Sequence, residues 1–285
     1  MPATLSPSAP PVSSAHLPVD LAGWLRYLKL AEIPVLARTA DALEDLRANE
    51  DAVDARTLAT LISADPLMTL KLLAYLASHR RSRQTTDVET ATEALVLLGI
   101  TPFFNAFGPQ PTIEQHLHDQ PEALAGLRAV IRRAHRAGKF ALGFAVHRFD
   151  HDAPVIYEAA MLCDFAEMLL WLHAPALALE IAQRQQAEPT LRSQSLQRQV
   201  LHVTLGEIQH ALMLEWRLPE LLVRITDDRQ EEASQVRNVL LAVRLARHTA
   251  RGWDNPAIPD DERDIAHLLN MGVASTAALL RDLDE

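Results

Sequence analysis

The segment from Val155 to Leu172 constrains the fold more than any other part of this 285-residue chain. Its pattern is helical and apolar on every side from Ala159 onward, where only Asp164 and Glu167 carry charge. A helix that is apolar all round is covered by neighbours on all its faces. The segment therefore predicts a central, buried helix. Because burying a bare carboxylate is costly, we expect Asp164 to be buried and hydrogen-bonded.

The composition indicates that the covering elements are also helices. Alanine, leucine, arginine and glutamate dominate, glycine occurs only 9 times, and Asn-Gly and Asp-Gly turn pairs are absent. The dominant residues are strong helix formers, and without turn pairs β-hairpins have little support. With 48% hydrophobic residues the chain is long enough to bury a substantial core. The sequence predicts an all-α fold.

Charge and cysteine content argue against several classes of function. The chain carries 27 basic and 37 acidic residues, so its net charge is -10 and a primary nucleic-acid role is disfavoured. A single cysteine rules out an internal disulfide and suits a reducing cytoplasm. No window of 18 apolar residues is present, which argues against a membrane span. We expect a cytoplasmic protein.

Proline, glycine and polar runs suggest how the chain is organised. Residues 1–19 are rich in proline, serine and alanine and are predicted to be a disordered leader. Residues 20–115 are predicted to form an N-terminal helical subdomain, and residues 116–285 a second helical bundle. The proline-rich stretch 101–121 places a soft seam between them near residue 115.

Helical spacing predicts the main elements of the second half. Long helices are expected over about residues 121–147, 155–172 and 196–216. A final pair is expected over about 236–252 and from 261 to the C-terminus.

Five residues receive structural roles. Asp65 is predicted to be an N-cap followed by Pro66 at the first helical position, where the missing N–H is not needed. Gly99 is expected to end a helix, and Pro219 to stand at the start of one. Trp216 is interpreted as a core anchor between helices.

Four segments, taken in order over roughly residues 33–270, resemble the HDOD family, the non-catalytic relatives of the HD-domain phosphohydrolases. They are Ile33 to Leu36 with the later run Asp65-Pro66-Leu67-Met68-Thr69-Leu70-Lys71-Leu72-Leu73, then Glu93 to Ile100, Glu158 to Glu167, and Gly206-Glu207 leading to Glu215-Trp216-Arg217-Leu218-Pro219-Glu220. The resemblance implies an HD-like helical bundle with a packed N-terminal helical subdomain, the two parts together forming one HDOD domain. In that reading residues 116–285 are the degenerate HD-like bundle.

The resemblance also implies that catalysis has been lost. Catalytic HD relatives carry a metal-binding His-Asp pair in the central helix, and the matching residues here are Cys163 and Asp164. A thiol is a poor ligand for the Mn, Fe or Mg ions that would activate water, and a buried thiol seldom ionises. We therefore expect no catalytic residue and no cofactor, with His135, Asp164 and Glu167 as the residual candidates for a metal site.

The candidates for ligand binding are few. Cys163 and Asp164 would lie in the decayed cleft, and Arg132 and Arg136 belong to a basic stretch over residues 128–136. Each has a plainer alternative. Cys163 is a small buried hydrophobe, the carboxylates belong to a salt-bridge network, and the arginines form a solvated helix face.

The function implied is that of a non-catalytic output or scaffold module in bacterial signal transduction, which acts by binding an unidentified signalling protein. Two alternatives stay open. One is a residual metal-dependent phosphohydrolase that uses His135 and Asp164, and the other is a nucleotide-sensing domain that uses the decayed cleft.

Overall fold

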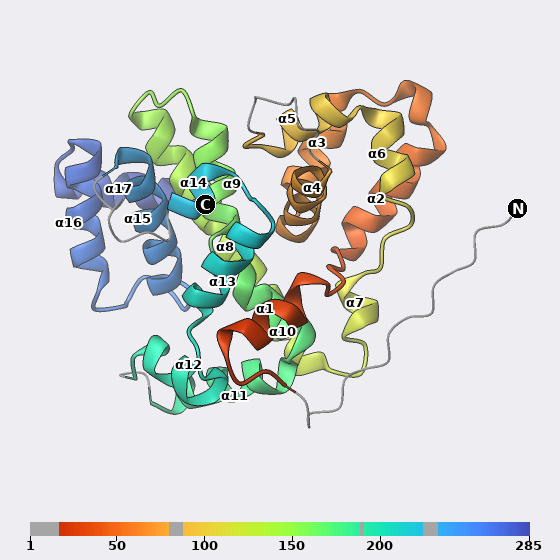
Figure 1. Ribbon diagram of the computed structural model, residues 1–285. Coiled ribbons are helices and arrows are strands. Elements are labelled where there is room, and N and C mark those ends of the chain that lie inside the picture. Colours follow the sequence, from red (N-terminus) through yellow and green to blue (C-terminus); the bar gives the residue numbers. More distant parts are fainter. Residues whose placement is uncertain (1–16, 80–87, 189–190, 225–232) are drawn as a thin grey trace, which may run out of the picture.

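The protein is helical throughout the residues described by its computed structural model, which are 17–79, 88–188, 191–224 and 233–285 (Figure 1). Within these ranges no strand forms, and the β-pairing is an isolated parallel bridge between Val35 and Thr112. The all-α prediction is confirmed. Most of the predicted leader, residues 1–16, lies outside the described residues.

The helices before residue 117 are α1 (Leu21–Lys29), α2 (Ala37–Ala48), the 3-10 turn η2 (Glu50–Ala52), α3 (Ala55–Ser63), α4 (Pro66–Ser78), α5 (Ala91–Leu98), α6 (Ile100–Ala106) and α7 (Ile113–His116). Those that follow are α8 (Pro121–His147), α9 (Ala153–Leu162), α10 (Phe165–His173), α11 (Pro175–Ala187), α12 (Ser193–Leu201), α13 (Leu205–Glu215), α14 (Glu220–Arg224), α15 (Ser234–His248), α16 (Ile258–Leu269) and α17 (Val273–Asp284).

Asp65 caps one helix and fixes another segment at the same time. One carboxylate oxygen accepts hydrogen bonds from the Leu67 and Met68 N–H groups, at 2.9 and 3.2 Å, with Pro66 at the first position of α4. The other oxygen accepts from Leu36 N at 2.9 Å, ahead of α2. These bonds compensate the burial of a side chain that is 0% exposed.

Two helices predicted to be continuous are each divided in the structure. The expected helix over 155–172 ends at Leu162 and begins again at Phe165, and the one over 196–216 breaks at His202, whose φ is 64°. An apolar pattern continues across a break of two or three residues, so periodicity alone could not locate it. A third break falls at Gly99, which ends α5 with φ 85° before α6 begins.

α8 is the central helix of the fold. It packs against α9, α10, α11, α15 and α17, and Figure 1 shows it between the C-terminal helices on the left and the N-terminal helices on the right. Its neighbours approach closely where it carries glycine: a Cβ at Gly126 would lie 2.5 Å from the ring of Trp171. The N-terminal helices join this bundle through α4, which contacts α9 and α10, and through α1, which packs on α13.

Among the described residues no single helix has both the length and the apolar character needed to cross a bilayer. The pair α3 and α4 meets that test only jointly, with a bend of 117° between the two helices.

A second buried carboxylate, Glu158 of α9, fastens the bundle to the N-terminal helices. It is 4% exposed and accepts hydrogen bonds from Ala91 N, at 2.9 and 3.1 Å, and from the Ser63 hydroxyl at 3.1 Å. These donors belong to the first residue of α5 and the last of α3. Burial raises the pKa of Glu158 to about 7, because the surrounding hydrogen bonds offset only part of the desolvation.

The raised pKa makes the stability of the protein depend on pH through Glu158. Between about pH 4.5 and 7 the unfolded chain loses the Glu158 proton and the folded chain keeps it, so the free energy of unfolding falls as the pH rises. Glu158→Gln, whose side chain does not titrate, should remove this fall in the free energy of unfolding. We expect the stability of the variant relative to the wild type to rise by about 2 to 3 kcal/mol between pH 4.5 and 8 in urea unfolding. An exposed control, Glu122→Gln, should show no such change, and a flat difference for Glu158→Gln would contradict the assignment.

Candidate functional site

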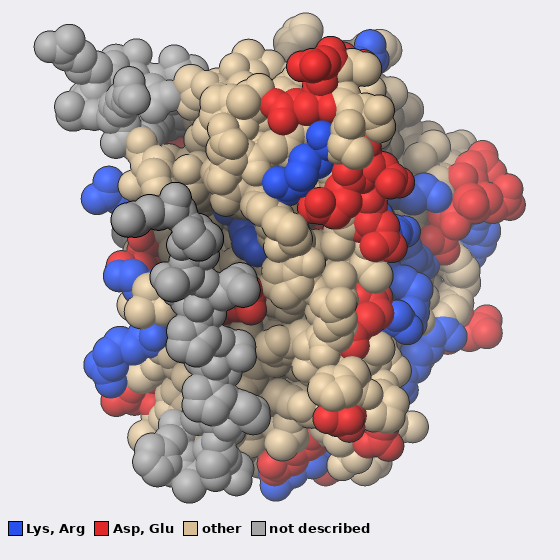
Figure 2. All heavy atoms as spheres, turned by 90° about the vertical axis from the view of Figure 1, so that its right-hand side faces the viewer, with Lys and Arg blue, Asp and Glu red and all other residues tan. Residues whose placement is uncertain are grey.

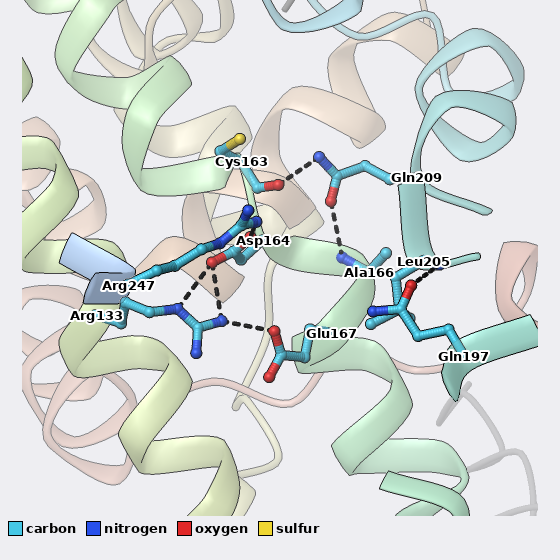
Figure 3. Close-up of polar contacts among 9 residues, drawn as sticks. All are labelled: Arg133, Cys163, Asp164, Ala166, Glu167, Gln197, Leu205, Gln209 and Arg247. Atoms are coloured by element: carbon cyan, nitrogen blue, oxygen red, sulfur yellow. Dashed lines mark hydrogen bonds and ion pairs between the residues drawn. The ribbon is translucent and has the colours of Figure 1, made fainter. Parts of the chain in front are cut away.

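The turn between α9 and α10 consists of Cys163 and Asp164, and a side chain from another helix completes it (Figure 3). Gln209 of α13, which is buried, donates from Nε2 to the Cys163 carbonyl at 2.5 Å and accepts from Ala166 N at 3.3 Å. Both partners are backbone groups that a broken helix leaves unpaired. Gln209 therefore stabilises the turn, because it forms hydrogen bonds with backbone groups on both sides of the break.

The carboxylate of Asp164 lies between two arginines from different helices (Figure 3). Arg133 of α8 donates to Oδ2 from Nε at 3.0 Å and from Nη2 at 2.8 Å, and Arg247 of α15 donates to Oδ1. Arg133 Nη2 also reaches Glu167 Oε2 at 2.5 Å. Two guanidinium groups and two carboxylates form a neutral cluster in which Asp164 is 7% exposed.

The arginines decide the protonation state of Asp164. Burial alone would raise its pKa, but the charges of Arg247 and Arg133 and their hydrogen bonds hold it well below its usual range. In return, the Asp164 carboxylate raises the pKa of Arg247. The positive charge that a metal would supply to this carboxylate comes instead from protein side chains.

His135 does not join this cluster. It stands two residues after Arg133 on α8, a rotation of about 200° around the helix axis, and the charges that act on it are those of Arg38 and Asp65. Burial lowers its pKa, and its Nε2 atom has no hydrogen-bond partner among the described residues. The structure thus separates His135 from Asp164 and Glu167. In the described parts of the chain, no three His, Cys, Asp or Glu side chains are grouped in a way that could hold a metal.

The side chain of Cys163 is a protonated thiol at neutral pH. Burial, with a further contribution from the charge of Asp164, raises its pKa to about 12. Its side chain points away from the two guanidinium groups in Figure 3. A thiol of this kind is a poor metal ligand and a poor nucleophile.

Three of the four arginines in the basic stretch over 128–136 are paired with carboxylates of the chain. Arg128 pairs with Glu114 at 3.0 Å, and Arg136 pairs with Asp284 at 2.7 Å, while Arg132 is exposed. On the face of the molecule seen in Figure 2, acidic and basic side chains are interspersed. Arg136 is therefore engaged within the fold, and a role for Arg132 and Arg136 in binding a ligand stays a prediction.

Trp216 and Pro219 lie at the end of α13. Trp216 is only partly buried, in contrast to a full core anchor: its ring packs near Phe165, with 5.9 Å between centroids, and its Nε1 donates to the Lys29 carbonyl at 3.4 Å. Pro219 is buried immediately before α14. Trp216 thus links the end of α13 to the end of α1.

Sequence reasoning missed the partners of Asp164. Arg133 and Arg247 stand in amphipathic helices where arginine is common, and Gln209 carries no charge, so no local pattern distinguishes them. The available signal was indirect. A cation can stabilise the ionised form of a carboxylate in an apolar helix, and arginines near the apolar side of long helices were the candidates.

Comparisons with known proteins agree with this fold. The structure is similar to the MmoQ response regulator from Methylococcus capsulatus str. Bath, with a TM-score of 0.65 and 21% identity over 88% of this chain and 98% of the other. It is also similar to a virulence factor from Campylobacter jejuni subsp. jejuni, with a TM-score of 0.62 and 17% identity over 93% and 98% of the two chains.

At these identities the likeness establishes the fold and not the activity. None of the curated proteins matches the chain. Residues 33–231, well over half of the sequence, match the HDOD domain, and the protein is therefore a member of the HDOD domain family.

Proposed function

We propose that this protein is a non-catalytic output or scaffold module of bacterial signal transduction, and that it acts in the cytoplasm by binding another protein. The observation that carries the proposal is the pairing of Asp164 with Arg133 and Arg247. An HD-type hydrolase needs that carboxylate for a metal ion. A carboxylate already held by two guanidinium groups would have to release both before it could ligate a cation.

The description of a structural neighbour supports the signalling part of the proposal. The MmoQ protein is described as a response regulator.

The proposal makes Asp164 a structural residue, and its replacement should lower stability. Asp164→Asn leaves two cationic side chains without their shared counter-charge, and removing one partner of a buried ion pair is strongly destabilising. Because Arg247 is about half exposed, solvent relieves part of the penalty. We expect a loss of about 2 to 3 kcal/mol in the free energy of unfolding, measured with urea.

An exposed ion pair provides the matched control for that measurement. Asp260 pairs with Arg263 at the surface, so Asp260→Asn should change the stability by less than about 1 kcal/mol. If Asp164→Asn were as stable as the wild type, Asp164 would not be the structural link described here.

Catalysis is tested on the purified full chain. With Mn²⁺ or Mg²⁺ added, we expect no hydrolysis of bis(p-nitrophenyl) phosphate above the metal blank, and less than stoichiometric metal in elemental analysis. The reason is that Asp164 is already paired and His135 faces elsewhere. Turnover or bound metal that disappears in Asp164→Asn would support the residual phosphohydrolase instead.

Partner binding is tested by capture from lysate of the source bacterium, with the immobilised full chain as bait. We expect at least one protein to be enriched over blank beads and to bind the purified chain directly in a titration. The Asp260→Asn variant should capture the same protein, since its fold is intact. No direct binder in repeated captures would contradict the proposal.

A further inference from the structure

Two adjoining hollows form a groove where the N-terminal helices meet the end of α13. The larger, of about 760 Å³, lies between α1, α4, the segment after α6 and the residues that end α13. The smaller, of about 380 Å³, continues past α4 toward α5 and α14. Ala77 and Arg217 line both hollows, so the two are continuous. We refer to them together as the seam groove.

The rims of the seam groove expose leucine. Leu30 lines the larger hollow and is 85% exposed, whereas Leu97 and Leu214 line the smaller and are 47% and 55% exposed. Single exposed leucines need no explanation, but several leucines around one groove favour an interaction site there. The apolar surface is therefore placed where a partner segment would cover it.

Arg217 stands between the two hollows in a strained conformation. It follows α13 with φ 50°, and the bonds of Arg217 N to Leu214 O and of Leu218 N to Met213 O close the helix end. Glycine is the usual residue at such a left-handed position, because a side chain is disfavoured there. The exposed Arg217 guanidinium makes no hydrogen bond or ion pair with the described part of the chain. Its charge is free for a ligand.

The charges that line the seam groove balance, although the whole chain has a net charge of -10. The larger hollow has Lys29, Lys71 and Arg217 against Glu32 and Glu215, and the smaller hollow adds Glu220 beside Arg217. Two of the three cations are already engaged. Lys29 pairs with Glu215, and Lys71 donates to the Ile33 carbonyl at 3.1 Å and to Gln110 Oε1 at 2.5 Å. Arg217 remains to meet an anion.

We propose that the seam groove binds an acidic, apolar segment of a partner protein, with apolar side chains in the two hollows and a carboxylate paired with Arg217. The inference rests on the proposed function and adds to it the chemistry of the partner. A small anion would satisfy Arg217 but would leave the rim leucines uncovered. A peptide segment accounts for both features, because helices and strands place anchors at regular intervals along a groove.

Because residue 217 has a left-handed backbone conformation, its side chain can be replaced by glycine without a loss of stability, so that an effect on binding is not an effect on folding. Arg217→Gly removes the charge and also relieves the backbone, so the variant should melt at the same temperature as the wild type or higher. His202→Gly is the matched control. His202 also ends a helix in the left-handed region, it is exposed, and it lines neither hollow.

The probe is a displayed library of random 16-residue peptides selected against the full chain. We expect the selected peptides to combine Asp or Glu with Leu, Ile or Phe. Their affinity should fall by at least about tenfold for Arg217→Gly, as loss of a charge-assisted hydrogen bond predicts. Affinity should be unchanged for His202→Gly and partly kept for Arg217→Lys.

Several results would overturn the assignment. They include a failure to select any peptide, a basic consensus among the selected peptides, and full peptide affinity in Arg217→Gly. Displacement of the peptide by inorganic phosphate or AMP alone would indicate a site for small anions. A concentration-dependent dimer that is lost in Arg217→Gly would indicate that a second copy of the chain occupies the groove. If Arg217→Gly still bound the protein captured from lysate at full affinity, the proposed function would stand and the seam groove would be excluded as its docking site.

Discussion

The ion pairs of Asp164 with Arg133 and Arg247 are the interaction on which the arrangement of the bundle depends. They join α8, the turn before α10 and α15 at one buried carboxylate, and Arg247 lies 83 residues from Asp164 in the chain. Burying an ionised carboxylate at this depth is costly unless cations and hydrogen bonds replace its water. The ion pairs therefore favour the approach of these three elements, which links the C-terminal helices to the centre of the fold.

Asp164 and Glu158 show how one functional group behaves in two buried settings. Both carboxylates are almost fully buried. Asp164 faces two guanidinium groups, and its pKa falls; Glu158 receives hydrogen bonds from a backbone N–H and a hydroxyl, and its pKa rises to about 7. The difference is the presence of full positive charge, which hydrogen bonds from neutral donors do not replace. One carboxylate is thus a permanent ion, and the other titrates near neutrality where the bundle meets the N-terminal helices.

Local signals in the sequence predicted the elements better than their junctions. α8 spans Pro121–His147, as the helical spacing indicated, because an amphipathic pattern repeats over many turns and proline marks its start. The breaks at Cys163-Asp164 and at His202 were not predicted, since apolar residues continue on both sides of each. They depend on remote or backbone features: a glutamine from α13 at the first, and a left-handed residue at the second.

By itself the sequence determined the helical class, the family resemblance and the burial of Asp164. The first follows from composition, the second from the order of four short segments, and the third from the apolar residues around Asp164. Only the tertiary structure decided what neutralises that carboxylate. His135, the nearest candidate by sequence, faces Arg38 and Asp65, whereas Arg133, two residues earlier, faces Asp164. A shift of two residues turns a side chain to another side of a helix, and the second partner, Arg247, reaches Asp164 only when α15 packs on α8. The seam groove likewise exists only where segments distant in the chain meet, so no pattern within one segment could predict it.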